Sequence, residues 1–194
     1  MNPEPGHRIR AFVAVEISEQ ARCQLKDLLR QLQTRAGRVR WVRPEQMHLT
    51  LVFLGEVSRN FVESARQRLA DAVAGSPAFS AQLCGIGAFP GPARARVVWV
   101  GMREGEEELK RLQAEVVRQL VGVGFEPEKR PFSPHLTIGR LKVPADVRAA
   151  CETQFESERF EIDRLVLFQS ILKPTGPEYI RLREWALGRM ANTQ

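Results

Sequence analysis

Disulfide and metal-binding patterns are missing from this sequence. Its three cysteines, Cys23, Cys84 and Cys151, lie far apart and form no C-x-x-C pair. An odd number of widely spaced cysteines argues against a disulfide framework and against a zinc site. No carboxylate or cysteine cluster has the spacing of metal ligands, so we expect a protein that uses no metal and no other cofactor.

Long apolar segments are missing as well. No stretch approaches the ~18 consecutive apolar residues of a membrane span. The start of the chain, Met1–Arg10, is polar, contains two prolines and lacks the apolar region of a signal peptide. The sequence therefore predicts a cytoplasmic protein that does not enter a membrane.

Acidic residues are fewer than basic ones. The chain has 23 acidic and 29 basic residues, and 24 of the basic residues are arginine. A basic balance favours anionic partners, nucleic acid first among them. The planar arginine fork suits phosphate binding, although codon bias would produce the same arginine usage.

Strands and helices alternate along the whole chain. Apolar β-branched runs and helical apolar stripes predict strands at 9–17, 39–42, 48–55, 79–84, 96–102, 135–141, 160–170 and 179–187, and helices at 18–37, 58–75, 106–121 and 145–155. The Gly- and Pro-rich segment between the fourth and fifth strands is expected to be a loop. No composition break marks a linker, which favours one domain over 1–194 with a core at 8–187 and a frayed tail at 188–194.

The tripeptide His-Leu-Thr occurs twice, at 48–50 and at 135–137, nearly half the chain length apart. In a strand, residues i and i+2 point to one face. Each strand would then present one imidazole beside one hydroxyl, and the repeated pattern indicates a duplicated unit. A single histidine in a strand is usually a core residue, but two matched copies argue against that explanation. His7 belongs to neither motif and is expected to be solvated.

Two such pairs suit attack on a phosphodiester. Imidazole can serve as acid or base near neutrality, and in-line displacement needs a base on one side of the phosphorus and an acid on the other. Threonine hydroxyls can hold the non-bridging oxygens where charge accumulates. The expected catalytic residues are His48 and His135, with Thr50 and Thr137 binding the phosphate.

At these residues the sequence resembles a known family. The segments RWVRPEQMHLTLVFLG and GFEPEKRPFSPHLTIGR, with RAFVAVEI and GIGAFPGP, are similar to the two-histidine phosphoesterase superfamily. Within it they resemble the bacterial and archaeal RNA 2′,3′-cyclic 3′-phosphodiesterases, also called 2′–5′ RNA ligases. The resemblance runs from about Arg8 to Leu187.

The resemblance implies an α+β fold, a bilobal pseudo-twofold duplication in which two antiparallel sheets form a central cleft with helices packed outside. It also implies opening of an RNA 2′,3′-cyclic phosphate to a 2′-phosphomonoester. In that reaction His48 is the proton donor and His135 the acceptor. The implied partner is an RNA 3′ end with a cyclic phosphate, tRNA fragments included, and the protein is expected to be a monomer.

Further substrate contacts are predicted from position. Arg43 and Arg130 each lie five residues before a motif histidine, in loops from which a guanidinium could reach RNA phosphates or remain solvated. Arg140 points away from His135 in a regular strand, so it can contribute only if the strand has a bulge or ends there. Phe132 could stack on a base or pack within its loop.

Three functions stay open at this point. Hydrolysis of the cyclic phosphate is the first, and ligation of RNA ends by the reverse reaction on the same site is the second. The third is a non-catalytic RNA-binding module, which the matched histidines disfavour because a binder needs no acid–base pair.

Overall fold

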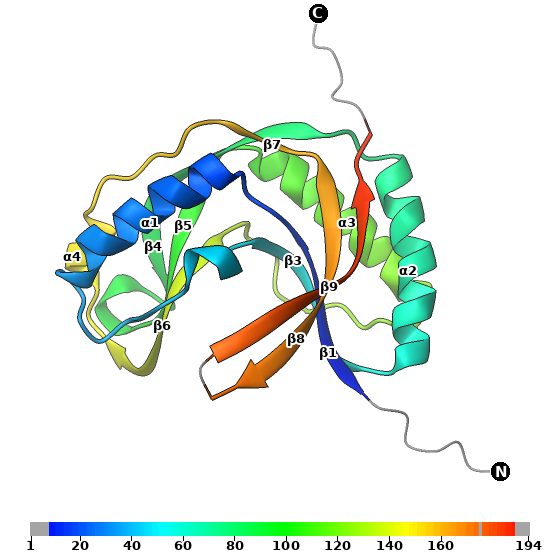
Figure 1. Cartoon of the computed structure of the whole chain (residues 1–194), viewed down its shortest axis with the longest axis horizontal. Helices are drawn as coiled ribbons and strands as arrows, with labels where there is room; N and C mark the ends of the chain where they lie inside the picture. Colours follow the sequence, from blue (N-terminus) through cyan, green and yellow to red (C-terminus); the bar gives the residue numbers. More distant parts are fainter. Residues whose placement is uncertain (1–7, 175, 189–194) are drawn as a thin grey trace, which may run out of the picture.

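A computed structural model describes residues 8–174 and 176–188, so His7 and nearly all of the predicted tail lie outside the described residues. The fold is α+β, with two antiparallel sheets, as predicted (Figure 1). The four-stranded sheet has the order β3-β1-β8-β9 and the five-stranded sheet the order β2-β6-β5-β4-β7. Figure 1 shows the two sheets joined into an arch with the helices along its outer side.

The strands of the four-stranded sheet come from both ends of the chain. They are β1 (Ile9–Val15), β3 (Leu49–Val57), β8 (Arg164–Lys173) and β9 (Gly176–Ala186). The strands of the five-stranded sheet are β2 (Arg40–Trp41), β4 (Phe79–Phe89), β5 (Ala95–Glu104), β6 (Leu136–Ala145) and β7 (Phe160–Ile162). Each sheet thus contains strands from both halves of the sequence.

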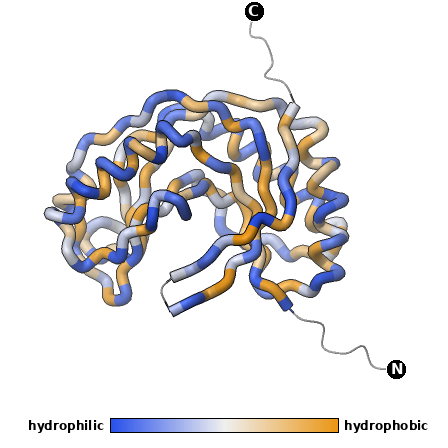
Figure 2. Tube along the Cα trace, in the orientation of Figure 1, coloured by the Kyte–Doolittle hydropathy of each residue, from blue (hydrophilic) through white to orange (hydrophobic). Residues whose placement is uncertain are grey.

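The helices are α1 (Glu19–Gln33), α2 (Arg59–Ala74), α3 (Glu106–Val121) and α4 (Arg148–Cys151), with 3₁₀ turns η1 (Pro44–Gln46) and η2 (Pro92–Arg94). Ser18 and Ser58 cap α1 and α2 by accepting hydrogen bonds from backbone N–H groups. Apolar and polar residues alternate along the three long helices (Figure 2) because one face of each is buried. None of the described helices is long and apolar enough to cross a membrane.

The helix of each of two related units packs against the sheet that contains the other unit. The unit β1–α1–β3 has its counterpart in β5–α3–β6, since each helix connects two paired antiparallel strands. Helix α1 contacts the five-stranded side, where Gln20 and Gln24 bond to Glu158. Helix α3 instead packs on α2 and on β3. This exchange gives both sheets one continuous apolar core.

A second, smaller cluster lies on the other side of the four-stranded sheet. Val13 and Val15 belong to the main core, whereas Phe12 and Ala14 alternate with them and pack with Val166 and Phe168. We call the sheet faces that turn away from the helices the inner face. The inner face carries both His-Leu-Thr motifs.

Three predicted elements differ from the structure. Strand β4 continues to Phe89 through the segment expected to be a loop, and the helix expected at 145–155 is confined to α4. The strand expected at 160–170 is divided at Asp163 into β7 and β8, which belong to different sheets. Gly188 also pairs with the chain at Pro77, so this first residue of the predicted tail is held in place.

Candidate active site

His48 lies at the end of a short turn, directly before β3. Its Nδ1 is 2.8 Å from the backbone oxygen of Gln46. The turn is held from outside by Arg22 of α1, which donates to the backbone oxygens of Pro44 and Met47. Because a carbonyl only accepts, Nδ1 must carry the proton, and Nε2 is left for a ligand.

His135 repeats this arrangement directly before β6. Its Nδ1 is also 2.8 Å from the backbone oxygen of the residue two positions earlier, here Ser133. Both imidazoles are therefore held in the same tautomer by the same local contact. Leu49 and Leu136, the central residues of the two motifs, are buried in the core as predicted.

The register of the sheets places both threonines on the inner face. Thr50 lies opposite Ala14, which belongs to the inner cluster. Thr137 lies opposite Trp99, which alternates with the buried core residues Val98 and Val100. Directly opposed residues of an antiparallel pair share a face. Neither hydroxyl bonds to a described residue, so both can donate to a ligand.

Aromatic rings surround His48. The Phe12 ring stacks on the imidazole with centroids 4.8 Å apart, and the Tyr179 ring meets it edge-on at 5.2 Å and 85°. Tyr179 is the chain's only tyrosine. These rings fix the imidazole plane and keep water from much of its surface.

His135 has a similar but more open environment. The Phe89 ring meets it edge-on at 5.1 Å and 85°, and Trp99 lies at 6.3 Å. The Trp99 indole lies directly over Gly87, where a Cβ would be 2.2 Å from the ring. The glycine therefore lets the indole lie against the sheet beside His135.

Arg140 reaches the inner face because β6 has the required bulge. Thr137 pairs with Trp99 and Gly139 with Val98, so Ile138 is an extra residue. Ile138 and Gly139 are both buried, and Arg140 follows on the exposed side. The bulge reverses the alternation, so Arg140 shares a face with Thr137. Its position as a substrate contact stays a prediction.

The surroundings of His48 disfavour its charged form. The pKa of His48 is lowered to about 4, chiefly by burial and also by the charges of Arg140 and Arg22, while the hydrogen bond to the Gln46 oxygen acts in the opposite direction. Arg140 belongs to β6, so its effect shows that the second motif strand approaches the first histidine. Strands β3 and β6 also contact each other directly. The strands that carry the two motifs therefore approach each other.

The other predicted contacts are Arg43, Arg130 and Phe132. Arg43 and Arg130 are exposed, and their side chains form no hydrogen bond or ion pair with the described residues. Phe132 is partly buried against the main core. Contact of these three residues with RNA stays a prediction.

Sequence reasoning missed the aromatic and positioning residues. Phe12 lies in the apolar strand β1, whose inner and core faces have similar composition, whereas Tyr179 lies among charged residues in β9. The contribution of Gln46 is a backbone oxygen, which any residue could supply. The Gly-x-Gly pattern at 85–87 was the available signal for Trp99, since it indicates close approach of a side chain to a strand.

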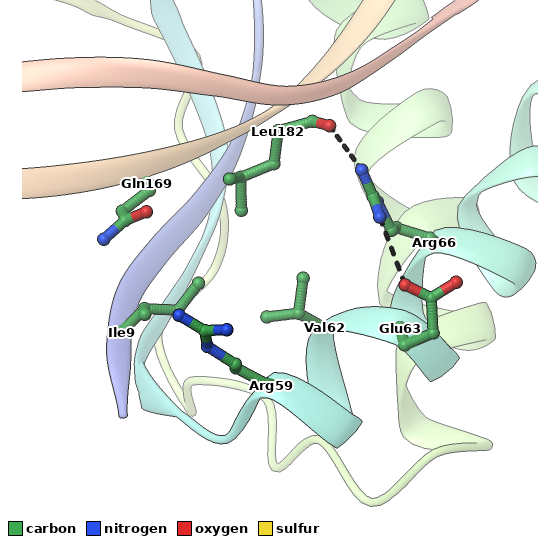
Figure 3. A pocket seen from close by; sticks show the side chains of 7 residues that line it. All are labelled: Ile9, Arg59, Val62, Glu63, Arg66, Gln169 and Leu182. Carbon is green, nitrogen blue, oxygen red and sulfur yellow. Dashed lines mark hydrogen bonds and ion pairs between the residues drawn. The ribbon is translucent and has the colours of Figure 1, made fainter. Parts of the chain in front are cut away.

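A pocket of about 320 Å³ lies on the opposite, helix-covered side of the four-stranded sheet. Figure 3 shows Arg66 at its edge, held by the Leu182 backbone oxygen and by Glu63. The lining contains no histidine, cysteine or threonine. This pocket offers no acid–base pair, and the candidate site is the inner face.

Metal ligands do not gather in the described part of the chain. Within residues 8–174 and 176–188, no three histidine, cysteine or carboxylate side chains lie close enough to hold an ion. Cys23 is exposed, and Cys84 and Cys151 are partly buried.

The inner face combines paired histidines, threonines and an arginine on duplicated strands, as in a two-histidine phosphoesterase. The sequence profile of the 2′-5′ RNA ligase superfamily matches residues 13–172. The chain belongs to this superfamily.

Individual relatives agree with this assignment. The chain is 40% identical to an RNA 2′,3′-cyclic phosphodiesterase of Archaeoglobus fulgidus over 178 residues, which cover 90% of this chain and 98% of the relative. It is 35% identical to the protein of the same name from Thermotoga maritima, with 91% and 94% of the two chains covered.

Solved structures share the fold. The apo crystal structure of E. coli LigT matches with a TM-score of 0.77 at 26% identity, and covers 95% of this chain and 100% of its own. The crystal structure of a Thermus thermophilus protein, TT0787, matches with a TM-score of 0.76 at 28% identity, covering 93% and 99%.

Proposed function

We propose that this protein hydrolyses the 2′,3′-cyclic phosphate at an RNA 3′ end to a 2′-phosphomonoester, without a metal ion. His48 and His135 are the general acid–base pair. The substrates are RNA fragments with such ends, cleaved tRNA among them. The names of the relatives from A. fulgidus and T. maritima support this substrate class.

One observation carries the proposal. Each motif histidine donates Nδ1–H to the backbone oxygen two residues earlier, at 2.8 Å in both cases. Both rings therefore present Nε2, on strands that contact each other. Two preset imidazoles on neighbouring strands can act on opposite sides of one phosphorus atom.

The steps follow from these positions. His135 takes a proton from water, which attacks the phosphorus. The bond from phosphorus to O3′ breaks, and His48 gives its proton to O3′. Thr50 and Thr137 donate to the non-bridging oxygens as charge builds on them, and Arg140 adds a positive charge beside His48.

The donor role of His48 requires a change of its pKa. With a pKa of about 4, only about one molecule in 10³ carries the proton at pH 7. A substrate phosphate would place a negative charge beside the ring and offset the effect of Arg140. We therefore expect substrate binding to raise the pKa of His48, so that the ring takes up a proton from water before the reaction.

This expectation can be measured by NMR titration of the imidazole Cε1–H signals, assigned with His48→Gln. Without ligand, the pKa of His48 should be about 4. With adenosine 2′-monophosphate bound, it should rise by about 1–3 units because an anion favours the imidazolium. An unchanged value with ligand bound would show that no phosphate lies beside His48, and the donor role would pass to His135.

Product analysis tests the proposed reaction itself. The protein is incubated with each nucleoside 2′,3′-cyclic phosphate in EDTA, and the product isomer is identified. We expect the 2′-phosphate at an undiminished rate. The rate should fall below the pKa of the base and above that of the acid, giving a bell-shaped pH profile. Activity that EDTA abolishes and a divalent ion restores would refute the mechanism.

Ligation is the second candidate, because the superfamily's name includes RNA ligase. The same two histidines would join a cyclic phosphate end to a 5′-hydroxyl end. Adding a 5′-hydroxyl RNA to the assay distinguishes the two reactions, since only ligation yields a longer product.

A further inference from the structure

Three arginines on the inner face lack acidic partners. Arg10 precedes Phe12 by two residues on β1 and shares its face, Arg40 belongs to β2, and Arg140 belongs to β6. None of them forms an ion pair with a described residue. Arg181, on the same face, differs because it pairs with Glu16 and Glu184. The first three guanidiniums therefore remain available to an anionic ligand.

Two of these arginines directly oppose each other. Arg40 and Arg140 are partners in the β2–β6 ladder, where like charges destabilise the sheet. Nη2 of Arg40 lies 3.2 Å from the position that a Cβ of Gly176 would take, at the turn of the β8–β9 hairpin. Tyr179 follows three residues later on β9, about 10 Å along the strand.

Arg10 reaches Tyr179 from the other side. Ala11 pairs with Gln169, and Ser170 pairs with Tyr179, so continuing the register places Arg10 opposite Ser170. Ser170 is small and buried, which lets the longer side chains on both sides of it approach each other. Glu56 lies opposite Arg10 on β3 but forms no ion pair with it.

The Tyr179 hydroxyl distinguishes the surroundings of the two histidines. Its ring meets His48 in the same edge-on geometry in which Phe89 meets His135. The Tyr179 hydroxyl is therefore a group that lies near His48 and has no equivalent on the Phe89 ring near His135. It has no hydrogen-bond partner among the described residues. Burial raises the pKa of Tyr179, although the charges of Arg140 and Arg10 lower it, so the group stays a neutral donor at pH 7.

We propose that Arg10, Arg40, Arg140 and the Tyr179 hydroxyl form a second phosphate subsite beside His48. It binds the phosphate on the 5′ side of the terminal nucleotide, one nucleotide away from the reacting cyclic phosphate. Arginine and phenol donors suit phosphate oxygens. This inference rests on the proposed function and adds to it the residues that bind the RNA one nucleotide before the reacting end.

Two substrates that differ by one phosphate test the subsite. They are uridine 2′,3′-cyclic phosphate and the same nucleotide with a 5′-phosphate, compared by the ratio of their kcat/KM values. We expect the native protein to prefer the 5′-phosphorylated substrate by about tenfold or more, a charged hydrogen bond's contribution. Arg10→Ala and Tyr179→Phe should each lower this ratio severalfold. Tyr179→Phe keeps the ring, so a mere packing role would leave the ratio unchanged.

Arg68→Ala is the matched control. Arg68 is exposed on α2, on the helix-covered side, so its loss removes one charge without touching the inner face. It should keep the native ratio. A native ratio near one, or variants that retain the native preference, would overturn the subsite alone. Hydrolysis of neither substrate by the native protein would overturn the proposed function and the subsite with it.

Discussion

His48→Ala and His135→Ala should each lower kcat on a nucleoside 2′,3′-cyclic phosphate by about 10²–10⁴-fold, the usual contribution of one general acid or base. Each imidazole is fixed by its own backbone contact and points Nε2 away from it. Removing one imidazole leaves the other in place, but the acid or the base on the opposite side of the phosphorus is lost. Steady-state kinetics of the purified variants measures the loss.

An aryl phosphodiester then assigns the two roles. An aryl oxide leaves without much help from an acid, so this substrate should partly rescue the variant that lacks the proton donor. We expect rescue of His48→Ala and little rescue of His135→Ala. The reverse pattern would make His135 the donor, in keeping with the low pKa of the unliganded His48.

Folding must be controlled, because His48 packs against Phe12 and Tyr179. His48→Gln keeps a polar side chain of similar reach and should unfold near the native midpoint. If both histidine variants are folded and both retain native activity on the cyclic phosphate, the two-histidine mechanism is wrong.

The sequence predicted the motif strands well because their signals are local. Alternation places Thr50 and Thr137 on the faces where the structure has them, and the leucine between each histidine and threonine is buried in the core. The bulge condition for Arg140 could be stated from the sequence, but whether β6 has a bulge depends on its pairing with β5. Register is a property of two strands, and one strand's sequence does not contain it.

The exchange of helices between the halves could not be predicted from the sequence. Each helix has one apolar stripe, which indicates that it packs on a sheet but not on which one. The residue Asp163 separates β7 from β8 within the segment 160–170, whose apolar residues by themselves predict one strand. Tyr179 escapes prediction for a related reason: the β8–β9 hairpin that carries it belongs to the sheet of β1, far away in sequence.

Thr50→Val and Thr137→Val should each reduce kcat on the cyclic phosphate by about 10²-fold, comparable to the loss of one oxyanion donor. Valine keeps the β-branched shape, so both strands should persist. Thr50 lies opposite the small Ala14 and Thr137 opposite Trp99, and in neither place does the hydroxyl bond to the described protein. Removing it therefore leaves no protein partner unsatisfied, and stability should change little.

The control for this substitution is Thr34→Val. Thr34 is exposed at the end of α1, where its hydroxyl donates to the Gln31 backbone oxygen. It should keep native turnover. A lower kcat in the Thr50 and Thr137 variants with little change in KM would show that both hydroxyls bind the charge that develops in the transition state. Loss of a contact already made to the bound substrate would raise KM instead. Native turnover in both variants would show that these hydroxyls do not touch the reacting phosphate, and the binding of its oxygens would then fall to other donors of the inner face.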